Sequence, residues 1–316
     1  MNVNQNDLLY EVFKFWFLRP ESSLLIYRRV LAIINSQINW QHGKNLDLSC
    51  GDGALSLIAA GGKFNNFFDA FLNVDHKIVK KLTKNKNIDI FNSDYENYKN
   101  LNNLVKVKPN YQFALGTDWK QNLLNKASKL NLYQKIILQD NNTELNIETE
   151  SIDNIYSNSI YWVTNIDLHL KEINRILKKN GKILLQIKTE EFNKLHPINS
   201  TLNIFSEESL NILDRGRLHT WKNIHPIDWW LKKFERLNLN INLIKPLYSK
   251  EQVALWHYGI RPISHVLIKM FNNLDLEKRT ETKLEFIESI LPILKDLAAL
   301  EPSKGNVYEY SITLSK

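Results

Sequence analysis

The sequence contains a single cysteine, Cys50, among its 316 residues. A lone cysteine cannot form an internal disulfide, which favours a reducing, cytoplasmic setting. Residues 1–7 carry no positive charge, and no long apolar stretch follows them, which argues against a signal peptide. The longest apolar runs, such as residues 15–18, are far shorter than the roughly 18 residues that a membrane span needs. We therefore expect a soluble chain without a membrane span.

Several other patterns are missing. No His or Cys cluster has the spacing of a metal site, so no metal is expected. No Ser–His–Asp set can be read, because the members of such a set lie far apart in sequence. There is also no internal repeat and no low-complexity linker. Together with the length, this favours one core with additions over two independent domains.

The charge balance is basic but diffuse. Lys and Arg number 41 against 34 Asp and Glu, a formal net charge of +7. The densest basic stretch, residues 77–86, is interpreted as a solvated face, because no aromatic residues interleave there. A surface for nucleic acid or phosphate is the alternative interpretation.

Apolar periodicity predicts alternating helices and strands. Strands are expected at 45–49, 113–117, 135–139, 152–157, 182–187, 241–245 and 307–314, and helices at 5–40 (interrupted at Pro20), 54–60, 121–130, 166–180, 226–237 and 283–300. Gly181 lies just past the expected end of the helix that begins at 166, where a left-handed residue is common. The alternation predicts an α/β fold with a Rossmann-like, seven-stranded, mostly parallel sheet and helices on both faces.

The expected organisation has four parts. An N-terminal helical cap (1–44) precedes the core (45–250), which contains a polar insertion at 61–110. A C-terminal helical insertion (251–305) follows, and the last core strand is expected within 306–316.

A strand that runs through a glycine turn into a helix is the strongest local signal. It reads LDLSCGDG, residues 46–53. Gly51 and Gly53 allow the backbone to approach a ligand closely, and the helix start offers free N–H groups. A purely structural turn is the alternative interpretation.

Acids follow the next two strands. Asp118 ends the second strand, where a carboxylate can accept hydrogen bonds from both ribose hydroxyls of an adenosine ligand. Asp140 follows the third strand and can accept from an adenine amino group. Asp75 is a rival for the ribose, because residues 71–75 also look like a strand that ends in an acid. Asp118 is preferred, because a helix and then Asp140 follow it at normal spacing.

The order of these segments resembles the class I, S-adenosylmethionine-dependent methyltransferases, especially their type 11 branch. LDLSCGDG is similar to motif I of that family, LDxGCGxG. Three further segments match in the right order: GTDWKQNLLNKASKLNLY (116–133), ILQDNNTELNIETESIDNIYSNS (137–159) and EINRILKKNGKILLQI (172–187). The resemblance covers about residues 44–190, without 61–110.

The resemblance implies S-adenosylmethionine as cofactor and assigns residues to it. Asp47 orients the glycine turn near the methionine end, Gly51 and Gly53 pass under the cofactor, and Ser49 belongs to the same turn. Asp118 binds the ribose, with Trp119 near the adenosine; Asp140 and Asn141 take the adenine. Ser157 and Asn158 end the fourth strand, where the methyl group meets its acceptor.

The sequence departs from the family pattern at three points. Ser49 stands where glycine is usual, so either its φ stays negative or the turn is strained. Asn180 replaces the usual Pro or Gly before Gly181. The insertion delays the ribose acid beyond the usual spacing of about 20 residues.

The acceptor is the least determined part. Tyr161 and Trp162 are expected to line its pocket, with aromatic packing as the alternative. His219, His225 and Tyr161 are the candidates for a general base, which is needed only if the acceptor must lose a proton. The Asn/Asp-Pro-Pro-Tyr motif of nucleobase amino methyltransferases is absent, which disfavours that acceptor.

We therefore expect a methyltransferase acting on a small molecule such as a sugar, lipid precursor or secondary metabolite. RNA methylation, S-adenosylmethionine binding without transfer, and aminopropyl transfer are the alternatives, in that order. The C-terminal insertion is expected to be a lid over the acceptor, or else a packing or dimer element. The oligomeric state stays open.

Overall fold

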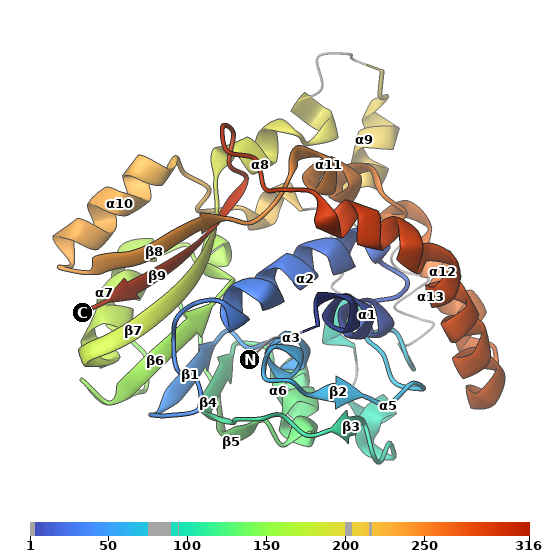
Figure 1. Cartoon of the computed structure of the whole chain (residues 1–316), viewed down its shortest axis with the longest axis horizontal. Helices are drawn as coiled ribbons and strands as arrows, with labels where there is room; N and C mark the ends of the chain where they lie inside the picture. Colours follow the sequence, from blue (N-terminus) through green and yellow to red (C-terminus); the bar gives the residue numbers. More distant parts are fainter. Residues whose placement is uncertain (1–3, 75–89, 94, 200–203, 215–216) are drawn as a thin grey trace.

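The computed structural model describes residues 4–74, 90–93, 95–199, 204–214 and 217–316 (Figure 1). Asp75 and the basic stretch 77–86 lie outside these residues. Seven strands form one sheet in the order β5-β4-β1-β6-β7-β9-β8, and within it β9 alone runs opposite to the other six. The strands are β1 (Asn45–Leu48), β4 (Phe113–Asp118), β5 (Tyr133–Leu138), β6 (Ile152–Ser157), β7 (Leu177–Lys188), β8 (Asn240–Pro246) and β9 (Glu309–Ser315). The predicted α/β fold and its seven-stranded, mostly parallel sheet are confirmed.

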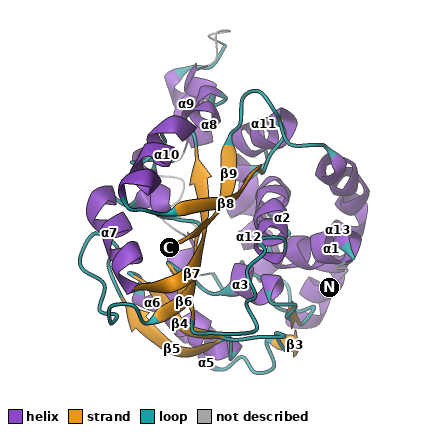
Figure 2. Cartoon of the chain, turned by 60° about the vertical axis from the view of Figure 1, so that its left-hand side comes forward, coloured by secondary structure: helices purple, strands orange, loops and turns teal. Residues whose placement is uncertain are grey.

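Helices cover both faces of the sheet, as expected (Figure 2). One apolar core lies between the sheet and α1 (Gln5–Phe15), α2 (Pro20–Ile34) and α3 (Ala54–Ala59). A second core lies under α7 (Ile166–Ile176) and α10 (Ile227–Arg236) on the opposite face. Pro20 is the first residue of α2, where its missing N–H leaves no hydrogen bond unmade. No helix in the described ranges combines the length and apolar character needed to cross a bilayer.

The connection from α7 to β7 differs from the expectation. The helix ends at Ile176, and β7 begins at Leu177, well before the predicted start at residue 182. Leu177 already pairs with Ile152 of β6, so sheet pairing ends the helix early. Asn180, not Gly181, adopts the left-handed conformation, with φ of 63°. Asparagine tolerates that conformation better than most residues, because its short polar side chain can hydrogen-bond locally.

The helix expected at 121–130 divides into α6 (Gln121–Ala127) and a 3-10 turn, η2 (Ser128–Leu130). Further along the chain, residues 139–151 connect β5 to β6 without a helix. After β7 come α8 (Glu190–Lys194), η4 (Pro197–Asn199), α9 (Glu207–Asp214) and η5 (Leu218–Thr220).

The insertion between α3 and β4 forms its own small antiparallel pair, β2 (Lys63–Phe64) with β3 (Val105–Val107). Between them the described residues include η1 (Ile90–Asn92) and α5 (Glu96–Lys99). Lys126 of α6 holds this region, because its Nζ donates to the Phe91 carbonyl at 2.7 Å and to Ser93 Oγ at 3.0 Å.

The C-terminal addition consists of α11 (Lys250–Tyr258), η6 (Arg261–Ile263), α12 (Ser264–Asn272) and α13 (Leu276–Ala299). α13 begins before the expected residue 283, because Asp275 caps it by accepting from the Lys278 N–H at 2.9 Å. In Figure 1 α13 runs beside α1, against which it packs, while α11 packs against α2.

One buried carboxylate joins α13 to the insertion. Arg279 donates to both oxygens of Asp69 at 2.7 and 2.9 Å, and Lys283 Nζ lies 3.1 Å from one of them. Lys283 also donates to the carbonyls of Asn66 and Phe68, at 2.8 and 2.9 Å. Asp69, Arg279 and Lys283, here called the Asp69 cluster, are at most 2% exposed, so both additions depend on one fully paired acid.

Candidate functional site

The glycine turn between β1 and α3 contains three left-handed residues. Ser49 has a φ of 67°, Gly51 of 59° and Gly53 of 78°. Of the two conformations open to Ser49, the structure therefore shows the strained one, which costs roughly 1–2 kcal/mol for a residue with a Cβ. The Asn141 amide donates to Ser49 Oγ at 2.6 Å and offsets part of that cost.

The two glycines of the turn serve different purposes. A Cβ on Gly51 would meet nothing within 4 Å, so this glycine borders open space. A Cβ on Gly53 would lie 3.0 Å from the Tyr133 ring, and one on Gly116 of β4 would lie 2.7 Å from the same ring. Gly53 and Gly116 are thus required by packing, whereas Gly51 leaves room for a ligand.

Asp47 lies beneath the turn and is 1% exposed. The Tyr133 hydroxyl donates to its carboxylate at 2.6 Å. Burial raises the pKa of Asp47 to about 6, although hydrogen bonds from Ser56 and Tyr133 oppose the shift. The structure therefore places Asp47 where it supports the turn from below.

Asp118, at the end of β4, meets the glycine turn directly. Its carboxylate accepts from the Gly51 N–H at 3.0 Å and from the Lys120 N–H at 2.9 Å. Burial raises the pKa of Asp118, and these backbone hydrogen bonds oppose the rise. The ribose candidate and the open-faced glycine are thus adjacent.

The loop after β5 also reaches this place through the contact between Asn141 and Ser49. Asp140 is exposed and accepts from the N–H and the side-chain amide of Asn142, both at 2.9 Å. Asn142 Oδ1 in turn accepts from Thr164 N–H at 2.7 Å and Asn165 N–H at 3.0 Å. The loops after β5 and β6 are therefore tied together across the ends of β4 and β1.

Ser157 ends β6 and is fully buried, and its hydroxyl has no hydrogen-bond partner within the described chain. Asn158, next to it, is half-buried. An unpaired buried hydroxyl at the end of a central strand is rare in folded proteins and is a natural contact for a bound molecule.

Trp119 and Trp162 lie on the surface of the site. Trp119 is 64% exposed and Trp162 45% exposed. The Lys120 ammonium lies 5.2 Å from the Trp119 ring and 5.9 Å from the Trp162 ring. The structure thus brings the residue after Asp118 close to the predicted acceptor side.

Tyr161 points toward a buried ionic group that the sequence did not reveal. Its ring centre lies 4.7 Å from the Nζ of Lys188, the last residue of β7. Lys188 Nζ is 2.6 Å from Glu309 Oε2, and Arg29 donates to both Glu309 oxygens at 2.7 and 2.8 Å. We call Glu309, Arg29 and Lys188 the Glu309 cluster.

The Glu309 cluster contains one buried carboxylate and two cations, so the charges do not balance. Burial alone would raise the pKa of Glu309, but Arg29 and Lys188 lower it to about 2. Burial and the neighbouring Arg29 lower the pKa of Lys188 to about 8. The only charged residue in the last strand was the available signal, but its partner depends on the register of β7 and β9, where Lys188 pairs with Glu309.

The histidine candidates lie at the edge of this arrangement. His225 stacks on Trp229 of α10, with ring centres 3.9 Å apart, and burial lowers its pKa. His219 is part of η5 and is exposed. The segment after η5 contacts the site through the Lys222 N–H, which donates to the Tyr161 carbonyl at 2.9 Å. No group of three or more His, Cys, Asp or Glu residues in the described ranges could hold a metal ion.

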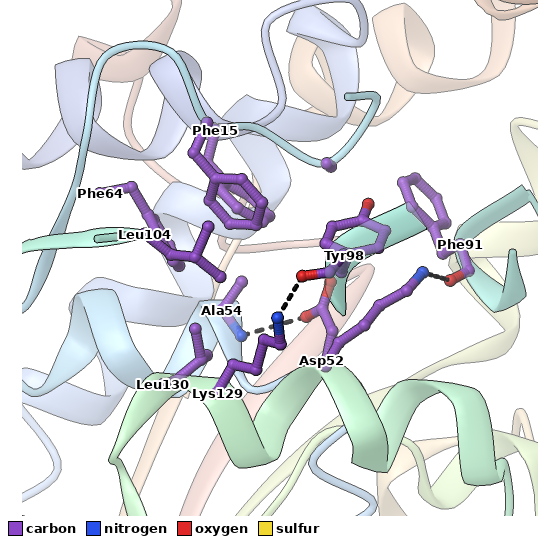
Figure 3. A pocket seen from close by; sticks show the side chains of 12 residues that line it. Phe15, Asp52, Ala54, Phe64, Phe91, Tyr98, Leu104, Lys129 and Leu130 are labelled. Carbon is purple, nitrogen blue, oxygen red and sulfur yellow. Dashed lines mark hydrogen bonds between the residues drawn. The ribbon is translucent and has the colours of Figure 1, made fainter. Parts of the chain in front are cut away.

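A narrow cavity of about 20 Å³ lies beside the glycine turn (Figure 3). Asp52 and Ala54 line it from the turn and the start of α3, and Phe15 lines it from α1. Phe91 and Tyr98 belong to the insertion. The N-terminal helices and the insertion therefore both abut the candidate site.

Comparison with known proteins identifies one matching family. Residues 97–185 match the Methyltransf_11 model, described as a methyltransferase domain. The match spans Asp118, Asp140 and Ser157 but begins after the glycine turn. None of the curated proteins matches the chain.

Many solved structures resemble the fold at low identity. A methyltransferase from Thermotoga maritima, described as a possible histamine N-methyltransferase, is 11% identical, with 98% of this chain and 99% of that chain covered and a TM-score of 0.45. One from Mesorhizobium loti is 11% identical, with 92% and 98% covered and a TM-score of 0.48. The [4+2]-cyclase SpnF is 11% identical, with 92% and 81% covered and a TM-score of 0.48.

Similarities this distant do not identify an activity. The family match has more weight, because it falls on the part of the sheet whose strand ends bear the candidate residues. On that match, residues 97–185 form a methyltransferase domain of the Methyltransf_11 kind within a Rossmann-like sheet, and such a domain takes S-adenosylmethionine as its cofactor.

Proposed function

We propose that the enzyme transfers the methyl group to a small-molecule acceptor, such as a sugar, lipid precursor or secondary metabolite, held above the ends of β6 and β7. The observation that supports this most is the contact of Asp118 with Gly51, whose other side borders open space. A small acceptor also agrees with the absence of the nucleobase motif at residues 157–162.

The residues at these strand ends fit the cofactor. Asp118 would hold the ribose hydroxyls beside Trp119, and Asp140 and Asn141 would hold the adenine. Asp47 supports the turn that carries Ser49, Gly51 and Gly53, and the unpaired Ser157 hydroxyl, with Asn158, would hold the methionine end.

Bound S-adenosylmethionine supplies a methyl group activated by a sulfonium. The protein's main task is then orientation, because in-line displacement depends on a short, aligned approach. Tyr161 and Trp162 would line the acceptor side. His219, His225 or Tyr161 would take a proton only if the acceptor releases one.

We also propose that residues 251–305 act as a lid and that the enzyme works in the cytoplasm. The lid proposal is supported by the packing of α11 on α2, beside the Glu309 cluster. Turnover that survives deletion of 251–305 in a folded protein would contradict it.

The test is calorimetric titration of the protein with S-adenosylmethionine and S-adenosylhomocysteine. We expect micromolar dissociation constants, and a loss of at least about tenfold in Asp118→Ala, because hydrogen bonds to a carboxylate are each worth about 1.5–3 kcal/mol. Asp167→Ala is the matched control, since that acid lies at the start of α7 and pairs with Lys233. Wild-type protein that binds neither compound, or equal binding by Asp118→Ala, would contradict the proposal.

Two alternatives give different outcomes. Tight cofactor binding without turnover on any acceptor would favour a binding protein. Turnover on RNA with a steep dependence on salt would favour RNA methylation, with which the net charge of +7 agrees.

A further inference from the structure

The chain has eight tryptophans, all within the described residues, and two of them are exposed. Trp119 is 64% exposed and Trp162 is 45% exposed, whereas the other six are at least partly buried. Scattered exposed apolar residues are ordinary, but these two lie together at one functional edge.

The two rings come from different loops and meet at one cation. Trp119 follows β4 and Trp162 ends η3 (Ile160–Trp162) after β6. Lys120 Nζ lies within 6 Å of both ring centres, at 5.2 and 5.9 Å. Both strands flank β1, whose turn carries the open-faced Gly51.

The turn η3 directs Trp162 away from the Glu309 cluster. Its neighbour Tyr161 lies over Lys188, on the buried side, while Trp162 lies near Lys120 at the surface. Ile160 is fully buried and anchors the turn. The Trp162 ring is therefore carried on a fixed support, which lowers the entropy cost of stacking a ligand on it.

Trp119 is already assigned to the adenosine, so Trp162 is left for the second substrate. Aromatic rings stack on flat ring systems, and an ammonium beside them attracts an anion. We propose that the methyl acceptor carries a flat aromatic ring with an anionic substituent, and that the ring stacks on Trp162 while the anion pairs with Lys120. This rests on the proposed function.

The test uses matched probes on protein saturated with S-adenosylhomocysteine. The probes are 4-hydroxybenzoate, its saturated counterpart 4-hydroxycyclohexanecarboxylate, and the neutral 4-hydroxybenzamide. Binding is followed by ligand-observed NMR titration of the wild type and of Trp162→Ala, Trp162→Phe and Lys120→Ala. Trp229→Ala, which alters a tryptophan on α10, is the control.

We expect 4-hydroxybenzoate to bind more tightly than the saturated acid. Trp162→Ala should weaken it about fivefold or more, Trp162→Phe by no more than about twofold, and Trp229→Ala not at all. Lys120→Ala should weaken the benzoate but not the benzamide. Binding of S-adenosylhomocysteine should be unchanged in Trp162→Ala.

Three results would overturn the inference. They are no binding of 4-hydroxybenzoate, equal binding of the saturated acid, and unchanged binding in Trp162→Ala. A short single-stranded RNA that binds the wild type and is lost in Trp162→Ala would instead assign the surface to nucleic acid. Failure of S-adenosylhomocysteine to bind at all would contradict the proposed function itself, so the two failures are distinguishable.

Discussion

Two buried clusters in this enzyme have the same composition but join different parts of it. Each places one carboxylate against an arginine that donates to both oxygens and a lysine that contacts one of them. The Glu309 cluster joins α2 to β7 and β9 beside the site. The Asp69 cluster joins the insertion to α13, away from the sheet.

The lysines differ in their remaining contacts. Lys188 lies over the rings of Tyr161 and Phe192, at 4.7 and 4.4 Å. Lys283 instead donates to two backbone carbonyls, those of Asn66 and Phe68. Lys188 is thus placed against side chains of the site, whereas Lys283 fixes the backbone around residues 66–68 of the insertion. The same arrangement of one acid and two cations therefore supports the site in the Glu309 cluster and holds the insertion to α13 in the Asp69 cluster.

Glu309→Gln should have the largest effect. It leaves Arg29 and Lys188 buried without a carboxylate, which costs about 3–5 kcal/mol of unfolding free energy. Urea denaturation at pH 7 measures the loss. Glu150→Gln is the control, because that acid is half exposed in its pair with Lys316 and should cost at most about 1 kcal/mol. Equal losses in both variants would break the comparison.

Asp69→Asn should cost about 3 kcal/mol, and the damage should be local. Hydrogen exchange should accelerate in α13 and residues 65–74 while the sheet keeps its protection. Affinity for S-adenosylhomocysteine should stay within about twofold of the wild type. Faster exchange throughout the sheet would show that the additions and the core unfold as one unit.

Acidification should remove the stabilising contribution of the Glu309 cluster. The pKa of Glu309 is about 2 in the folded state, below its ordinary value of 4.5. Its contribution is therefore complete above about pH 4.5 and is lost as the pH falls toward 2, up to about 3 kcal/mol. Unfolding free energies measured across this range should fall less steeply in Glu309→Gln. Parallel pH profiles for the two proteins would count against this.

The smallest effect should separate the two lysines. Lys283→Met should cost about 2 kcal/mol more than Lys188→Met, because it leaves two buried carbonyls without a donor. Thermal or urea unfolding of the two variants gives the difference. Equal costs would mean that the carbonyl contacts of Lys283 contribute little.

Much of the sheet could be predicted from the sequence, because apolar periodicity and glycine placement are local. The turn at residues 46–53 and Asp118 at the end of β4 are where the pattern placed them. The end of α7 was not predicted, because it depends on pairing of Leu177 with Ile152 of another strand.

The Glu309 cluster could not be predicted for the same reason. Lys188 and Glu309 are 121 residues apart in sequence, and only the register of β7 against β9 brings them together. The left-handed Ser49 was also beyond local rules, since Asn141 of a different loop holds its hydroxyl.

Tyr133 links the choice of residue at three positions. Its ring occupies the space that a side chain at Gly53 or Gly116 would need, and its hydroxyl reaches Asp47. During evolution a larger residue at 53 or 116 would therefore be accepted only after Tyr133 had become smaller, and Asp47 would then lose one of its two side-chain donors. Related sequences should therefore vary together at positions 47, 53, 116 and 133.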